Sequence, residues 1–271
     1  MLSSRRPARL PFPGLDGSPS PLGMGVMTST GAIYLGSTLG TATHTLHAYK
    51  LYVALHGEFD LLLDNSRVSR SLRGVVIAPN RPHRIVGREC LVALCYIVPE
   101  TPEGRILSKY YRSRAAFAPP SRMLTAWKPC LRRLFESGGG RDELTETSGR
   151  LIRSLLADKD VAAEHDPRVA LTLEYIRSAP ERRVTVTELA SLVGLSPGRL
   201  EHLFSEQVGI PISRYMTWNR LHSALELMPH GASLTEVAHR AGFADLSHLG
   251  RTFRRMLGLS PSAIQRHISR P

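Results

Sequence analysis

Short apolar runs separated by turn residues predict β-structure over the first third of the chain. In the run at 49–56, Leu51, Val53 and Leu55 share one face, as in a strand with one side turned inward. Many short strands at close, even spacing favour a small β-barrel or a sandwich, here over 26–100. The runs are AIYL at 32–35, YKLYVALH at 49–56, FDLLL at 59–63, GVVIAP at 74–79 and LVALCYIV at 91–98.

From about 101 to 160 the apolar spacing changes to that of helices, which predicts a helical connector. Leu107, Tyr110 and Tyr111 form one apolar face there, and Trp127, Leu131 and Phe135 belong to another. Two interpretations stay open. These faces form a homodimer contact, or they pack on the barrel of the same chain.

The C-terminal third contains one pattern twice, at 185–204 and at 233–253. Glu188, Ala190 and Gly194 match Glu236, Ala238 and Gly242 at a spacing of 48 residues, and Leu200 and Phe204 match Leu249 and Phe253 at 49. The extra residue falls in the turn. A repeat of this length predicts two copies of one supersecondary unit.

Each copy has the parts of a helix-turn-helix. Thr185 and Ser233 are expected to cap a first helix, each with a glutamate three residues later. A glycine then ends that helix in the left-handed conformation. Ser196, followed by Pro197, and Asp245 are expected to cap the second helices. The alternative is a helical repeat without a DNA partner.

The segment 211–228 between the copies has helical periodicity, with Pro211 at its start. A helix of roughly 18 residues is about 27 Å long. Such a rod can set two helices about one DNA turn apart, ~34 Å, in adjacent major grooves.

Charge changes this picture little. The chain of 271 residues has a formal net charge of +12, which favours an anionic partner. However, 166–271 carries thirteen arginines, no lysine and nine acidic residues, so the surplus is not concentrated in the repeat. The motif, and not the net charge, supports DNA binding.

Three cysteines without a pairing pattern fit a reducing, cytoplasmic setting. No apolar run has the ~18–20 residues that a membrane-spanning helix needs. Residues 1–25 are rich in Pro, Gly and Ser and predict a disordered, solvated tail, with contact to DNA or RNA polymerase as the alternative.

The motifs ELA…GLS…RL…F and EVAHRAGFAD…F…R…G.SP resemble the AraC/XylS family of bacterial transcription regulators, over about 166 to 266. In that family the second helix of each unit enters the major groove. The resemblance places Gly198, Arg199, Glu201 and His202 at a first groove and Ser247, His248 and Arg251 at a second, with Arg254 and Arg255 on the DNA backbone.

The side chains suit these roles. Arg251 can pair with O6 and N7 of guanine, and Glu201 can accept from N4 of cytosine but repels phosphate. Gly198 stands where a larger side chain is often found, so the first unit is expected to read fewer bases. Arg254 and Arg255 are expected to position the protein without specifying sequence.

The N-terminal region resembles the cupin-type sensing domain common in this family. Its pattern from Gly74 to His83 resembles the second half of a cupin motif, and two histidines lie near the position of the first. Glu58 does not have the expected spacing, so no metal and no cofactor are predicted. The residues expected to line an effector site are His44, His47, Tyr52 and His83.

The sequence thus predicts an α+β chain. The domains are a tail at 1–25, a small cupin-like β-barrel at 26–100, a helical connector at 101–160 and an all-α domain of two helix-turn-helix units joined by a long helix at 166–271. The predicted function is sequence-specific transcription regulation controlled by a small-molecule effector, with no catalysis. The alternatives are a metal-dependent cupin enzyme fused to a DNA-binding module and a structural DNA-binding protein without sequence choice. Predicted partners are double-stranded DNA, RNA polymerase, an effector and a second copy of the chain, with no membrane.

Overall fold

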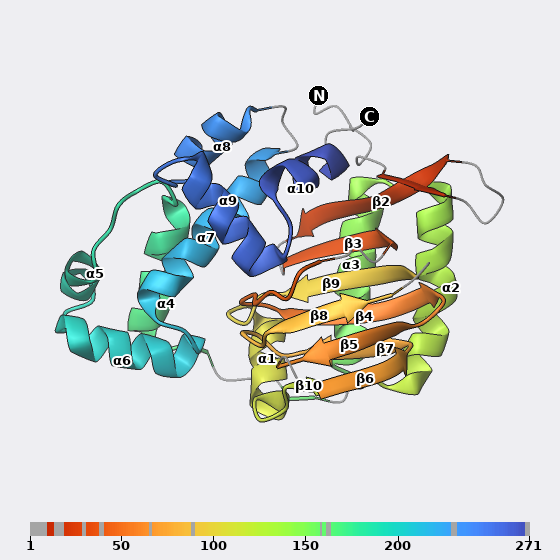
Figure 1. The fold of residues 1–271 in the computed structure, drawn as a ribbon. Coiled ribbons are helices and arrows are strands. Elements are labelled where there is room, and N and C mark those ends of the chain that lie inside the picture. The colour runs from red at the N-terminus through yellow and green to blue at the C-terminus, as the bar shows by residue number, and fades with distance from the viewer. Residues whose placement is uncertain are drawn as a thin grey trace. The chain divides into compact units, whose positions relative to one another are not determined.

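The computed structural model of the chain describes residues 10–13, 19–28, 31–37, 41–64, 67–87, 90–157, 159–160, 164–228 and 232–268. It is an α+β structure that divides into two compact units. One comprises Met1–Ala162 with Arg254–Pro271, and the other is Ala163–Phe253. Figure 1 shows antiparallel strands and their helices in the first unit and helices alone in the second.

The strands of the first unit form two antiparallel sheets. The larger has seven strands in the order β1-β2-β3-β9-β4-β7-β10, and the smaller has the order β6-β5-β8. Their bounds are β1 Leu10–Pro13, β2 Pro19–Thr28, β3 Gly31–Ser37, β4 Tyr49–His56, β5 Phe59–Leu63, β6 Arg67–Leu72, β7 Gly74–Ile77, β8 His83–Val86, β9 Leu91–Ile97 and β10 Ala116–Phe117.

The predicted small β-barrel is not closed within the described residues, whose strands form two separate sheets. The tight turn at Gly57, which has a φ of 71°, carries the chain from β4 into β5. β4 pairs with β7 and β9, whereas β5 pairs with β6 and β8. The hydrogen-bond ladder therefore passes into two sheets and does not close on itself.

Strand β4 is buried on both faces, although its sequence pattern predicted one buried face. Leu51 and Val53 belong to the hydrophobic cluster shared with the helices. Tyr52 and Ala54, on the opposite face, belong to a second cluster with Phe59 of the smaller sheet. Because both faces are covered, the alternation of Leu and Tyr in this strand does not mark an inside and an outside.

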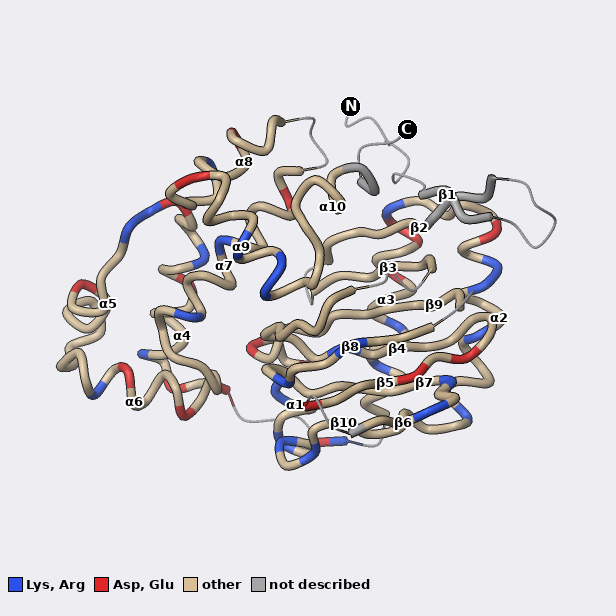
Figure 2. Tube along the Cα trace, viewed as in Figure 1, with Lys and Arg blue, Asp and Glu red and all other residues tan. Residues whose placement is uncertain are grey.

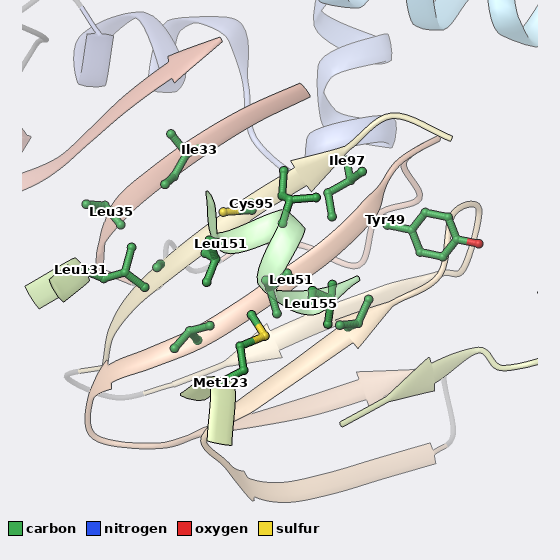
Figure 3. Close-up of a cluster of buried hydrophobic side chains, with 14 of the residues drawn as sticks. Ile33, Leu35, Tyr49, Leu51, Cys95, Ile97, Met123, Leu131, Leu151 and Leu155 are labelled. Carbon is green, nitrogen blue, oxygen red and sulfur yellow. The ribbon is translucent and has the colours of Figure 1, made fainter. Parts of the chain in front are cut away.

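Three helices cover one face of the larger sheet, in the positions that the sequence predicts for the connector. They are α1 Pro102–Tyr111, α2 Ser121–Ser137 and α3 Arg141–Leu155. Leu107, Leu131 and Leu134 are buried in the same cluster as the strands, so these apolar residues pack within the chain. Figure 3 shows Met123 and Leu131 of α2 and Leu151 and Leu155 of α3 among Ile33, Leu35, Leu51, Cys95 and Ile97 of the strands.

Part of the segment predicted to be a disordered tail forms strand β2. Its residues Gly23–Thr28 pair with Gly36–Gly31 of β3, and Met24 and Val26 are buried in the helix-side cluster. Burial of such side chains stabilises each by about 1.5–3 kcal/mol, which explains the order despite the Gly content. The prediction for residues 1–9 and 14–18 lies outside the described part of the chain.

The second unit contains helices α4 to α8 and most of α9. The bounds are α4 Pro167–Ser178, α5 Val186–Leu192, α6 Pro197–Val208, α7 Ile212–Leu227, α8 Leu234–Arg240 and α9 Leu246–Leu257, followed by α10 Pro261–Ile268. The predicted domain start at 166 lies three residues beyond the first residue of this unit.

Candidate functional site

Helices α5 and α6 form the first helix-turn-helix, and their ends are capped as the sequence predicts. The Thr185 hydroxyl accepts from the Glu188 backbone N–H at 3.2 Å, while the Thr185 N–H donates to Glu188 Oε2 at 2.6 Å. Gly194 follows α5 with a φ of 66°, in the left-handed region. Ser196 then caps α6, and Pro197 is its first helical residue.

Helices α8 and α9 repeat this local structure. The Ser233 hydroxyl accepts from the Glu236 N–H at 3.2 Å, and the Ser233 N–H donates to Glu236 Oε2 at 3.3 Å. Gly242 follows α8 with a φ of 77°. Asp245 Oδ1 accepts from the His248 N–H at 2.6 Å, so it caps α9 as predicted.

The inner faces of α6 and α9 are fixed by matching buried residues. Leu200 and Phe204 of α6 are fully buried, as are Leu249 and Phe253 of α9. Since a helix that buries one face presents the opposite face to solvent, these contacts determine which side chains of α6 and α9 face outward.

The structure places most of the predicted DNA-contacting side chains on those outer faces. His248 is the exception, because it is half-buried with its ring at 5.2 Å from the ring of Phe243. It therefore supports the turn of the second unit as well as standing beside the exposed residues. The exposed predicted residues are Gly198, Arg199, Glu201, His202, Ser247, Arg251, Arg254 and Arg255.

The long helix between the units, α7, begins one residue later than predicted, because Pro211 is its N-cap and not its first residue. Its 16 residues correspond to about 24 Å. Arg177 of α4 donates from Nε to the hydroxyl of Tyr215 at 2.8 Å, and Asn219 Nδ2 donates to the Ile176 carbonyl at 2.9 Å. These bonds join one turn in the first half of α7 to the C-terminal end of α4.

Helices α6 and α9 differ in the charge of their side chains. Helix α6 contains one arginine and two glutamates, whereas α9 contains three arginines and no acidic residue. Figure 2 shows basic residues in blue and acidic residues in red along α6, and basic residues in blue along α9. Phosphate attracts arginine and repels glutamate, so α9 is the stronger electrostatic anchor for a nucleic acid.

The predicted effector residues of the first unit fall into three separate groups. His44 and His83 form one group, with their ring centroids 4.4 Å apart and both side chains buried. His47 lies in a second group, donating from Nε2 to Glu100 Oε1 at 2.5 Å and accepting from Asn80 Nδ2 at 3.2 Å. Tyr52 packs on Phe59, 5.8 Å between rings, in the cluster that includes both sheets.

Sequence reasoning missed the residue that joins the first group. Lys50 Nζ lies 2.7 Å from His44 Nε2 and 2.8 Å from His83 Nε2, and Lys50 is 1% exposed. The available signal was a lysine inside the apolar run YKLYVALH, in step with Tyr52. Burial lowers the pKa of Lys50, and it lowers the pKa of His44 to about 3 and of His83 to about 2.

Within the described residues, no group of three or more His, Cys, Asp or Glu side chains is arranged to hold a metal ion. No helix in the same part of the chain combines the length and apolar character needed to cross a membrane.

Comparison with known proteins finds matches to the C-terminal region. Residues 189–267 match the model of a helix-turn-helix domain. An AraC-like transcription regulator of Streptomyces antibioticus is 34% identical over 103 residues, which are 38% of this chain and 34% of that protein. The transcriptional activator RhaS of Escherichia coli is 28% identical over 184 residues, 65% of this chain and 63% of RhaS. The chain thus aligns with less than two thirds of the length of these relatives.

The fold extends further than the sequence match. The crystal structure of ToxT from Vibrio cholerae shares it over 89% of this chain and 95% of ToxT, with a TM-score of 0.56 and 14% identity. A ToxT structure with a bound unsaturated fatty acid gives a TM-score of 0.56 at 13% identity, over 87% of this chain and 91% of ToxT. Residues 189–267 thus match a helix-turn-helix domain, the C-terminal region is similar in sequence to AraC-like transcription regulators, and the chain shares its fold, β-rich N-terminal domain included, with ToxT.

Proposed function

We propose that the chain is a transcription regulator that binds specific DNA sequences and responds to a small molecule bound in its N-terminal domain. The observation that carries the proposal is the repeated helix-turn-helix. Two units with the same caps and the same buried faces each leave one outward face of polar and charged residues. Such a face is what a helix needs to enter a major groove.

In this proposal α6 and α9 enter adjacent major grooves, and α7 sets their separation. Arg251 reads a guanine, while Arg254 and Arg255 hold phosphates. Gly198 leaves a gap on α6, where a Cβ would meet nothing within 4 Å. RNA polymerase and a second copy of the chain remain predicted partners.

For the N-terminal domain, we propose that the effector lies between the two sheets, as in the cupin-like arrangement that the sequence suggests. Buried Lys50, His44 and His83 lie beside an apolar cluster that includes Tyr52 and Phe59. A few polar groups at an apolar interior are typical of small-molecule sites. The fatty-acid complex of ToxT shows that a protein of this fold binds a small molecule.

Selection from a library of random DNA duplexes tests the function directly. The full chain is expected to enrich one sequence with two conserved blocks about one helical turn apart. Affinity for that sequence at fixed salt should exceed affinity for unrelated duplex by about 10³-fold or more. Enrichment of no sequence would instead support a structural DNA-binding protein without sequence choice.

When Arg251→Ala is measured in that assay, Arg133→Ala is its matched control. Arg133 is an exposed arginine of α2, in the other unit, so its removal changes net charge as Arg251→Ala does. The control is expected to bind the selected sequence as the unaltered chain does, because charge at that site contacts no base.

A further inference from the structure

Lys50 is one of the polar groups of the proposed effector site, and the reactivity of its amine is a further property of that site. Lys50 comes from the larger sheet, whereas His83 comes from the smaller one. His44 is joined to His83 by two backbone hydrogen bonds, of 3.1 and 3.0 Å. The contacts from Nζ to the two imidazoles therefore connect one sheet to the other.

The protonation of both imidazoles follows from their second nitrogens. His44 Nδ1 lies 3.0 Å from the Ala42 carbonyl oxygen, and His83 Nδ1 lies 2.7 Å from the Arg81 carbonyl oxygen. A carbonyl only accepts, so each Nδ1 carries a hydrogen and donates it. In the neutral rings that burial favours, each Nε2 then presents a lone pair to Lys50.

Two acceptors match the two hydrogens of an uncharged amine. Donation to His44 and His83 uses both N–H groups of a neutral Nζ and leaves its lone pair unengaged by them. Burial lowers the pKa of Lys50, which favours this uncharged form. The ring of Tyr96 lies 5.7 Å from Nζ, and its side chain adds apolar surface on the same side of the sheet. A desolvated, uncharged lysine is a nucleophile.

We propose that Lys50 is a covalent capture site for a small aldehyde or ketone, which it holds as an imine between the two sheets. This inference rests on the proposed effector control of the N-terminal domain and names the chemical class of the effector. The geometry that carries it is the cluster of one buried amine and two imidazole acceptors.

The reaction is balanced without any further reagent. The Nζ lone pair forms a bond to the carbonyl carbon, and the π electrons of the C=O bond move to oxygen. Nε2 of His44 or His83 takes a proton from nitrogen and passes it to that oxygen, giving a carbinolamine. The nitrogen lone pair then expels the hydroxyl group, which leaves as water with the second proton. One water is released, and nothing is oxidised or reduced.

Binding of the carbonyl compound would change the number of hydrogen bonds that Nζ donates between the sheets. The free amine has two N–H groups for two imidazoles, a protonated imine has one, and a neutral imine has none. At least one bond from Nζ to His44 or His83 is therefore lost when the carbonyl binds. The free and the effector-bound domain therefore differ in the number of bonds between the sheets, and this difference can shift the domain between two states.

The composition of the chain makes the test simple. It contains four lysines, of which Lys50 is buried and Lys109, Lys128 and Lys159 are exposed or half-buried. The full chain is treated with benzaldehyde and sodium cyanoborohydride at pH 7, and the benzylated lysines are identified by peptide mass spectrometry. We expect Lys50 to be labelled at least about tenfold faster than the other three, because each unit of lowered pKa raises the uncharged fraction about tenfold.

Two controls make either result decisive. In guanidinium chloride all four lysines should be labelled at similar rates, which proves that the Lys50 peptide is detected. In Lys50→Arg, which cannot form an imine, the fast labelling should disappear while the other three sites react as before. Labelling of Lys109, Lys128 and Lys159 with Lys50 untouched in the folded chain would overturn the proposal. The assay contains no DNA, so that result would leave the proposed DNA binding standing.

Discussion

The two helix-turn-helix units have nearly the same scaffold and very different outer faces. Both begin with a capping box and turn at a left-handed glycine, and both bury a leucine and a phenylalanine of the second helix. Yet α6 has one arginine against two glutamates, and α9 has three arginines and no acid. Backbone hydrogen bonding and packing determine the scaffold, and both are alike in the two units. The residues of the outer faces are not constrained by packing, so they can differ according to what each face binds.

This comparison assigns the units different work. Under the proposed function, we expect the second helix-turn-helix to supply most of the attraction to the phosphates and the direct reading of guanine. We expect the first to select against poor sequences through Glu201 and to add little affinity. The following predictions test that division of work and the scaffold that the two helix-turn-helix units share.

Replacing Arg251 with alanine should cost specific DNA binding about 1–3 kcal/mol, or roughly 5- to 150-fold in affinity, and relax one base position. Arg199→Ala, on the first unit, should cost less than about 1 kcal/mol, because it removes one positive charge near Glu201 and no paired base contact. Titration of the selected duplex at fixed salt measures both. Equal losses would break the division of work between the units.

The two turn glycines should differ in their tolerance of a side chain. At Gly194 a Cβ would meet nothing within 4 Å, so Gly194→Ala pays only the left-handed penalty of roughly 1–2 kcal/mol. At Gly242 it would lie 2.6 Å from the Pro180 carbonyl oxygen. Gly242→Ala should therefore destabilise by a further ~1–3 kcal/mol. Urea unfolding of the two variants compares them, and matching midpoints would show that Pro180 moves away freely.

The capping boxes offer a finer contrast. Thr185→Ala and Ser233→Ala should each lower the free energy of unfolding by about 1 kcal/mol, since each leaves a helix N–H without its side-chain acceptor. We expect the larger loss from Thr185→Ala, because its return bond to glutamate is 2.6 Å long and that of Ser233 is 3.3 Å. The same urea experiment decides, with Thr187→Ala, an exposed residue of α5, as the control.

Glu201→Gln should raise affinity for unrelated DNA by a few tenths of a kcal/mol, because one repulsion from phosphate is removed. Affinity for the selected duplex should change less if Glu201 accepts from a cytosine. Binding curves for the two duplexes at several salt concentrations separate these effects. A fall in affinity for both would mean that Glu201 supports α6 and does not face DNA.

The smallest expected effect is a titration. The backbone N–H and hydroxyl of Thr185 donate to the Glu188 carboxylate and hold its pKa below its ordinary value. A depressed carboxyl pKa stabilises the fold above its unfolded pKa, and this contribution disappears as pH falls through the folded pKa. Carboxyl-carbon NMR should therefore show Glu188 titrating below about 4.3, the value for an isolated glutamate. A normal titration would show that the box is open in solution.

The fold of the helical unit, Ala163–Phe253, follows from its sequence because the signals that determine it are local. Within each copy, the cap, the left-handed glycine and the buried phenylalanine lie within 20 residues of one another, from Thr185 to Phe204 and from Ser233 to Phe253. The fold of the β-rich unit was harder to predict from the sequence. Whether β4 and β5 share a sheet depends on pairing between distant segments, and Lys50 meets His83 across 33 positions. No local pattern predicts such a contact, so the interior cluster and the second buried face of β4 were missed.

Methylation interference on the selected duplex tests the central claim most directly. Full-length protein is bound to duplex methylated sparsely at guanine N7, and the bound and free fractions are compared. The account predicts interference in two major-groove blocks about one helical turn apart, with one guanine losing its effect in Arg251→Ala. Interference confined to a single block, or none that depends on Arg251, would contradict it.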